Sequence, residues 1–145
     1  MKLSDFDFRI YDNHNKKYID NIPYSIKKYQ NENEVFLPFN TDLREYGFNE
    51  TFKNEIQIPS DRVEVELWTG LYDKNGKKIY ENDIVKVKSS YDRFLAKISI
   101  HKEGTFYLEN KNGNYIGSLI YLVEDEGYAI EIIGNIHENH KLLEY

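Results

Sequence analysis

The sequence holds one histidine pair that could bind a metal ion, His137 and His140, close to the end of the chain. On a helix, a separation of three residues places both imidazoles on one face. Zinc sites use at least three protein ligands, and the chain has no cysteine and no clear third ligand beside this pair. We therefore expect no metal site, and no pattern in the sequence calls for a cofactor.

Other sequence motifs typical of metal binding or catalysis are incomplete or absent. Asp73–Gly76 begins like a calcium-binding loop, but the later ligands of such a loop do not follow, so we expect a turn. Glu124–Glu126 is an acidic run that favours a solvated loop or, alternatively, a docking patch for a basic partner. The chain has no phosphate-binding glycine loop, dinucleotide fingerprint or nucleophile elbow. Because no nucleophile, base and oxyanion donor can be assembled, we expect a protein that is not an enzyme.

Aromatic and basic residues in the second half of the chain are the candidates for binding. The aromatic candidates are Tyr72, Tyr91, Phe94, Tyr107 and Tyr115, and the basic ones are Lys86, Lys88, Arg93 and Lys97. Exposed rings on small barrels stack on bases or hold peptides, whereas rings on strands more often pack in the core or across strands. Lys86 and Lys88 alternate onto the same side of a strand, where they either bind an anionic ligand or keep that face soluble.

Composition and charge narrow the class of protein. The chain has 145 residues and a net charge of -6, which disfavours general attraction to nucleic-acid phosphate and suits a partner with a basic face. Mean hydropathy is -0.71, and no long apolar stretch follows Met1–Asp5, so we expect neither a signal peptide nor a membrane anchor. The absence of cysteine is compatible with the cytoplasm, and the oligomeric state is left open, homo-oligomers included.

Most of the chain has the pattern of short strands and tight turns. Strands with period-two alternation are expected at 6–11, 17–19, 62–68, 84–87, 94–100, 105–109 and 129–133. Val63, Val65 and Leu67 should form the apolar face of one strand, and Val85 and Val87 that of another. Asn75-Gly76 and Asn112-Gly113 are typical of turns with positive φ. This spacing predicts a small barrel or sandwich.

Four segments are less regular. Residues 22–29 could add a strand at a sheet edge, because Pro23 cannot donate a ladder hydrogen bond, and the apolar run 35–37 should end at Pro38. Residues 39–59 show neither strand nor helix periodicity, except for one short helix that Leu43, Tyr46 and Phe48 could support. Residues 118–123 fit either a strand or one helical turn after Ser118, and 139–145 could form a terminal helix.

Three blocks of the sequence resemble the YopX family of phage and prophage proteins. Phe8–Asp12 followed by Asn15–Lys17 resembles the family's "KFRAWD" strand and "NKKM". Trp68–Val85 is similar to "YTGLKDKNGKEIYEGDIV", and Ile132–Asn139 is similar to the start of "VIGNIYENPELL". Asn82 stands where the family has glycine, and because Asn tolerates a left-handed backbone we expect the turn to be kept. His140 replaces a proline and Trp68 a smaller aromatic residue.

The resemblance implies a fold and a setting, and no active site. It implies a mainly β fold, an SH3-like small barrel with additional N-terminal strands and a short C-terminal helix or tail. On this basis residues 1–61 should hold the N-terminal strands and a variable insert, and 62–145 the barrel and tail, as one cooperative unit. Family members occur in phages and prophages of mainly Gram-positive bacteria. We therefore expect an accessory protein, a non-catalytic module that binds a host or phage protein and counters host defence. The alternative is a small barrel that binds nucleic acid.

Overall fold

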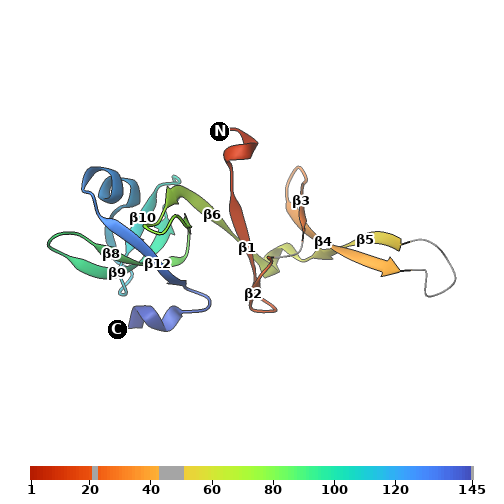
Figure 1. Ribbon diagram of the computed structural model, residues 1–145. Helices are drawn as coiled ribbons and strands as arrows, with labels where there is room; N and C mark the ends of the chain where they lie inside the picture. Colours follow the sequence, from red (N-terminus) through yellow and green to blue (C-terminus); the bar gives the residue numbers. More distant parts are fainter. Residues whose placement is uncertain (21–22, 43–50, 145) are drawn as a thin grey trace. The chain divides into compact units, whose positions relative to one another are not determined.

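The computed structural model describes residues 1–20, 23–42 and 51–144 of the chain (Figure 1). Its contacts divide the chain into two units, Met1–Arg9 with Glu66–Tyr145, and Ile10–Val65. Two strands, β1 (Phe8–Asp12) and β6 (Val63–Tyr72), each run from one unit into the other. The fold is mainly β with few helices, which confirms the expected fold class. In the described part of the chain, no helix is long and apolar enough to cross a membrane.

The first unit is built on a curled antiparallel sheet of five strands in the order β11-β10-β9-β8-β12. Its elements are η1 (Leu3–Asp5), β7 (Lys78–Tyr80), β8 (Asp83–Lys88), β9 (Arg93–Ile100), β10 (Phe106–Glu109), β11 (Tyr115–Ser118), η4 (Tyr121–Asp125), β12 (Ala129–Asn135) and η5 (His140–Glu144). Strands β8 to β11 follow one another along the chain, and β12 returns to pair with β8. The sheet has the curvature of a half-barrel, consistent with the expected small barrel.

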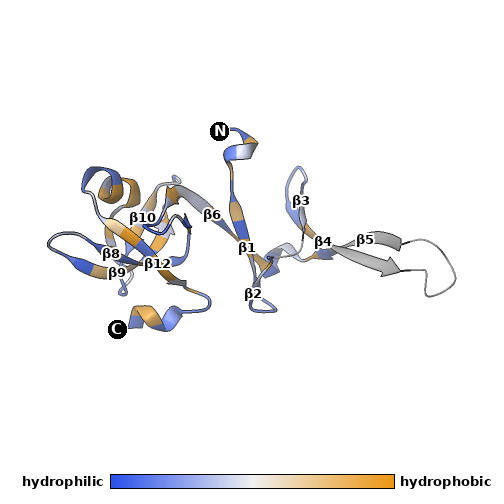
Figure 2. Ribbon diagram, viewed as in Figure 1, coloured by the Kyte–Doolittle hydropathy of each residue, from blue (hydrophilic) through white to orange (hydrophobic). Residues whose placement is uncertain are grey.

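One face of this sheet forms the core of the first unit. Val85 and Val87 are fully buried, as their alternation predicts, and Ala96 and Ile98 pack beside them from β9. Figure 2 shows hydrophobic residues beside hydrophilic ones along β8, β9 and β12. The buried cluster consists of Ile79, Val85, Val87, Ala96, Ile98, Leu108, Leu119 and Ile130. This core fixes which side chains must point outward from the sheet.

The turns and short helices follow the expected chemistry. Gly76 and Gly113 both have φ of +80°, which confirms the two Asn-Gly turns, and Asn82 has φ of +69°. After β11 the chain forms a turn of π-helix, where Ser118 Oγ accepts the backbone N–H of Tyr121 at 3.5 Å, so the helical alternative for 118–123 is correct. A short 3-10 helix, η5, ends the described chain, as expected.

The second unit contains β2 (Lys17–Tyr18), β3 (Ser25–Lys28), β4 (Asn33–Asp42), β5 (Thr51–Ile58) and η3 (Ser60–Arg62). Strands β1 and β2, predicted at 6–11 and 17–19, pair as an antiparallel hairpin, and β3-β4-β5 form a three-stranded sheet with β3 at its edge, after Pro23. The expectation that a strand ends at Pro38, and that 39–59 lack regular structure, was wrong for β4 and β5. Because β3 pairs only with 33–36, β4 at Pro38 is paired on one side alone, with Glu55 of β5, and such an edge position tolerates proline. The helix expected around Leu43, Tyr46 and Phe48 lies outside the described residues.

Two predicted strand faces are wrong. In β6 the valine expected to face the core, Val65, is 48% exposed, whereas Glu66 is fully buried. In β1, alternation of residues 6–11 places Phe6, Phe8 and Ile10 on one face and Tyr11 on the other, yet the Tyr11 ring is also buried, with an edge-on contact to Tyr18. Alternation finds the strand but assumes that the polar side faces water. That assumption fails for Glu66 because its carboxylate has buried partners.

Candidate functional site

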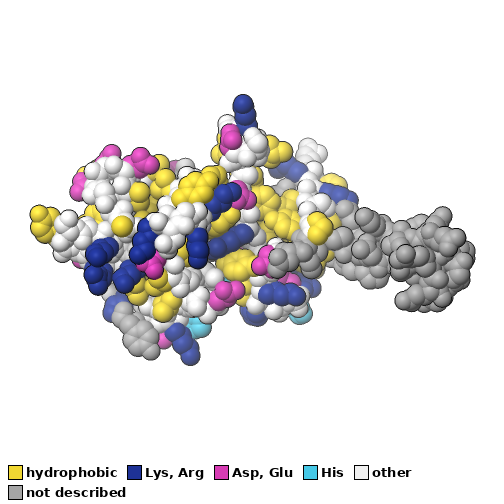
Figure 3. Space-filling model, viewed as in Figure 1, with side chains coloured by type: hydrophobic (Ala, Val, Ile, Leu, Met, Phe, Trp, Pro, Cys, Tyr) yellow, Lys and Arg dark blue, Asp and Glu magenta, His cyan; other side chains and the backbone are white. Residues whose placement is uncertain are grey.

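The strand register brings the predicted basic residues together on the outer face of the five-stranded sheet. Lys88 pairs with Arg93 on one side and Ala129 on the other, and Lys86 pairs with Glu131. The small side chain of Ala129 leaves a hollow of about 110 Å³ between them. This cation pocket is lined by Lys74, Lys86, Lys88, Arg93, Ala129 and Glu131. Figure 3 shows lysine and arginine side chains gathered over this part of the molecule.

The acids on this face are already held by lysines. Lys74 Nζ lies 2.6 Å from Glu131 Oε2, and its hydrogen bond is the main reason that the pKa of Glu131 is lowered. Lys97 Nζ lies 3.3 Å from Glu109 Oε2. No ion pair joins the other three cations, Lys86, Lys88 and Arg93, to a described residue. The pocket therefore has a surplus of positive charge although the chain is acidic.

Three rings gather farther along the same outer face. Tyr107 pairs with Ser99, and Glu109 pairs with both Lys97 and Tyr115, so these side chains share the face that carries the cations. The His101 and Tyr107 rings are stacked with centroids 4.0 Å apart, and the Tyr115 ring lies 5.5 Å from that of Tyr107. Tyr115 is 59% exposed. We call His101, Tyr107 and Tyr115 the ring cluster.

The other aromatic candidates do not join this face. Phe94 packs against the core, with its ring 6.3 Å from that of Tyr128. Tyr72 lies on β6, edge-on to Trp68 at 5.5 Å, and Tyr91 is 99% exposed in the turn between β8 and β9. Composition alone could not separate core rings from surface rings, and it also missed Lys74 and His101, which only the backbone path brings to this face.

An apolar groove lies elsewhere in the first unit. It consists of two hollows of about 330 and 240 Å³ that share Thr69, Gly104 and Phe106 in their walls. The larger hollow is also lined by Met1, Asp5, Phe6, Asp7, Leu67, Trp68, Gly70 and Ile100, and the smaller by Leu71, Thr105, Ser118, Leu119 and Ile120. The lining residues include two carboxylates, those of Asp5 and Asp7, and no lysine or arginine. No sequence pattern pointed to this groove, because its walls come from segments far apart in the chain.

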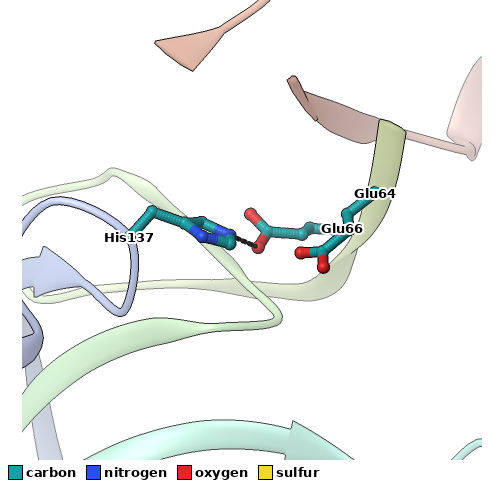
Figure 4. Close-up of side chains that lie close together, drawn as sticks. All are labelled: Glu64, Glu66 and His137. Carbon is teal, nitrogen blue, oxygen red and sulfur yellow. Dashed lines mark hydrogen bonds and ion pairs between the residues drawn. The ribbon is translucent and has the colours of Figure 1, made fainter. Parts of the chain in front are cut away.

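A buried ionic network joins the three blocks of sequence that resemble the YopX family. Arg9 Nε donates to Glu66 Oε1 at 2.7 Å, and Arg9 Nη2 donates to Asp83 Oδ1 at 2.8 Å. The other Glu66 oxygen accepts Asn82 Nδ2 at 2.7 Å and lies 2.9 Å from His137 Nε2. Figure 4 shows the contact between His137 and Glu66; Glu64, also drawn, belongs to the second unit.

The two carboxylates in this network, those of Glu66 and Asp83, are nearly dehydrated. Asp83 is 2% exposed, and burial raises its pKa although Arg9 and the backbone N–H of Tyr80 oppose the shift. The N–H of Tyr80 donates to Asp83 Oδ2 at 2.8 Å, so the Asp83 carboxylate also accepts a local backbone bond. His140, the other residue of the histidine pair, is exposed at the start of η5. These contacts give Arg9, Asn82 and His137 structural partners.

The fold and these surfaces define a small β protein with an exposed cation pocket, an apolar groove and a buried ionic network. The chain belongs to the YopX family, since the family model described as YopX protein matches residues 7–144. A search of curated proteins finds no match.

Two solved structures resemble the fold. Protein yopX from Bacillus subtilis is 18% identical, with a TM-score of 0.56, and the alignment covers 94% of this chain and 96% of that one. Protein EF1440 from Enterococcus faecalis is 23% identical, with a TM-score of 0.51 and coverage of 95% and 97%. At these identities the likeness concerns the fold alone.

Proposed function

We propose that the chain is a non-catalytic binding module that takes a segment of a partner protein into the apolar groove. The observation that carries this proposal is the adjacency of the two hollows, which share three wall residues. Two adjacent apolar hollows suit an extended or helical peptide better than a compact metabolite, because successive side chains of a peptide can fill successive hollows.

The groove offers apolar surface that binding would remove from water. Ile120 is 60% exposed and Phe6 is 41% exposed, and both line the groove. Burial of apolar surface is worth about 25 cal/mol per Å², and well-packed pockets of this kind hold the few residues that dominate a protein interface. The free chain leaves this surface open, and a partner side chain would cover it.

Charge selects the kind of partner. Asp5 and Asp7 line the groove, and the acidic run Glu124–Glu126 follows Ile120 along η4. The Asp7 carboxylate is held by Lys78 at 2.8 Å, whereas Asp5 is exposed. We therefore assign the groove to a peptide that has apolar anchors and at least one basic residue. This matches the docking role that the sequence left open for the acidic run.

The partner in this proposal is a host or phage protein in the bacterial cytoplasm, and its capture counters host defence. Support for that setting comes from the phage and prophage occurrence that the YopX resemblance implies. The shape and lining of the groove support the claim that the ligand is a protein segment. The family resemblance supports the claim that this protein belongs to a bacterial host or a phage.

Comparative capture from a bacterial lysate tests the proposal. Ile120→Arg places a cation in the acidic, apolar groove and should abolish capture of the partner. Tyr91→Arg also introduces an arginine, but at a side chain that is 99% exposed and lies outside the groove. This control variant should capture as much of the partner as the unmodified chain captures. Both variants must melt at the temperature of the unmodified chain. A partner that binds the Ile120→Arg variant undiminished would show that the groove is not the site.

A further inference from the structure

We propose a second binding site, independent of the groove: the outer face of the five-stranded sheet binds single-stranded nucleic acid. The cation pocket would hold the phosphates, and the ring cluster would stack on the bases. The net charge of -6 disfavours general phosphate binding. The cation pocket on this face, however, carries a net positive charge.

The phosphate end is the cation pocket. Lys86, Lys88 and Arg93 converge on a hollow of about 110 Å³, and none of the three has an ion-pair partner among the described residues. The one carboxylate in the lining, Glu131, lies 2.6 Å from Lys74 Nζ. Four cations around a single carboxylate leave a positive local potential, and a bound phosphate would lower it.

The base end is the ring cluster. The 4.0 Å stack of His101 on Tyr107 already has the geometry in which a planar base adds to a pile of rings. Tyr115, at 5.5 Å from Tyr107 and 59% exposed, leaves ring surface for a base to cover. Aromatic platforms of this kind accept any base, because every base has a π-face. The site would therefore have little sequence preference.

The two ends are spaced for a short strand. Arg93 and Ser99, the partner of Tyr107, are separated along β9 by six residues, or roughly 20 Å at about 3.3 Å per residue. Stacked nucleotides rise about 3.4 Å each, so this span corresponds to about six of them. A mononucleotide cannot reach both ends. A duplex cannot offer its base faces to the rings, so the ligand is a single strand.

The test is fluorescence anisotropy with labelled oligothymidine, oligouridine and a duplex of equal length, at low and moderate salt. We expect both single strands to bind more tightly than the duplex. Three phosphate contacts predict a slope of log K against log salt of about -2, since each contributes about -0.7 on single strands. Lys86→Glu combined with Lys88→Glu should reduce affinity at least tenfold and flatten the slope to about -0.7.

Two further variants separate the site from general electrostatics. Tyr115→Ala should weaken binding about tenfold with an unchanged salt slope, because stacking releases no counterions. Lys111→Glu combined with Lys141→Glu makes the same change in net charge at exposed lysines outside the pocket, and should leave affinity within about twofold. All variants must melt like the unmodified chain. No binding by the unmodified chain, equal losses in both double variants, or equal affinity for the duplex would overturn the proposal.

Discussion

Glu66 has no exposed surface, yet its carboxylate is satisfied on both oxygens, by Arg9 on one and by Asn82 and His137 on the other. Arg9 also serves Asp83, so one guanidinium lies between two buried acids. A planar guanidinium suits this task because its donors spread in a fixed fork. The pairing offsets a desolvation cost that either acid alone could not sustain.

Loss of Arg9 should therefore be severe. Arg9→Met leaves both carboxylates buried without their cation and should reduce the free energy of unfolding by about 3–5 kcal/mol. Lys74→Met is the matched control, because Lys74 and Glu131 form a more exposed pair worth about 0–1 kcal/mol. Urea unfolding measures both. Equal effects of the two substitutions would show that the network does not stabilise the fold.

The same variant should respond to acid. Burial raises the pKa of Asp83 in the folded chain, and Arg9 opposes that shift. Without Arg9, the pKa of Asp83 in the folded chain rises further. The folded variant therefore loses stability as pH rises from the ordinary pKa of an aspartate toward this raised value. As pH falls from about 7 to about 4, Asp83 takes up its proton more readily in the folded variant, so the difference in unfolding free energy between Arg9→Met and the unmodified chain should become smaller. A gap that stays constant over this range contradicts the assignment.

The pKa of Asp73 is shifted in the opposite direction to that of Asp83. Burial favours a higher pKa, but the backbone N–H groups of Lys77, Ile132 and Asn75 outweigh burial and lower the pKa below 3.8. Its stabilisation is present above 3.8 and is lost as pH falls through the lowered value. Asp73→Asn should cost about 1–3 kcal/mol near neutrality, because the amide cannot accept all three bonds. In urea unfolding the cost should shrink toward zero near about pH 2, and a loss independent of pH would exclude this cause.

The strands that sequence reasoning found are those whose buried face is continuous and apolar. Val85 and Val87 on β8, the two Asn-Gly turns and the short terminal helix were all predicted from local pattern. Strands β4 and β5 were missed because Pro38 and a run of polar residues hide their periodicity, and only sheet pairing shows that Pro38 lies on a free edge. The face of β6 was misassigned because partners of Glu66 lie 57 residues earlier and 71 later.

The candidate surfaces also differ in whether the sequence could predict them, according to how close their residues lie along the chain. Lys86, Lys88 and Arg93 were found because they lie close in sequence on two strands joined by a turn. The apolar groove was not found, since its walls combine residues near the N-terminus with residues of β6, β10 and η4. Period-two alternation reports the face of a single strand, and it carries no information about which distant segments meet.

Substitution of Val85 tests whether the inner face of the five-stranded sheet is the apolar core. Val85→Asp puts a carboxylate without a partner among apolar side chains, and should cost several kcal/mol, on the order of the whole stability of a domain. Lys86→Asp places the same side chain one residue along, on the outer face, and should shift the melting temperature little. Thermal unfolding followed by circular dichroism measures both, and similar melting temperatures would place Val85 outside the core.

Across the whole molecule, β1 and β6 connect the two units. The chain passes from Arg9 to Ile10 and from Val65 to Glu66 without leaving a strand. Arg9 and Glu66, the residues at these crossings, form the 2.7 Å ion pair of the buried network. The second unit has few buried apolar side chains among its described residues: Ile10, Tyr11, Val35 and Ile58.

We therefore expect the chain to unfold as one cooperative unit. Strands β1 and β6 are neighbours in a four-stranded sheet with the order β2-β1-β6-β7. If they separate, the Arg9–Glu66 pair loses its alignment, and because both strands run through both units, the two units lose them together. Hydrogen exchange of peptides from β4–β5 and from β8–β9 should then show the same urea midpoint, because a two-state transition gives coincident curves for all probes. Ile58→Ala in the second unit and Ile98→Ala in the first should each reduce the free energy of unfolding by about 2–5 kcal/mol, as expected for a buried isoleucine, and should lower both urea midpoints together. If Ile58→Ala loosened only β4–β5 while β8–β9 kept its midpoint, the units would be independent domains and the shared strands mere connections.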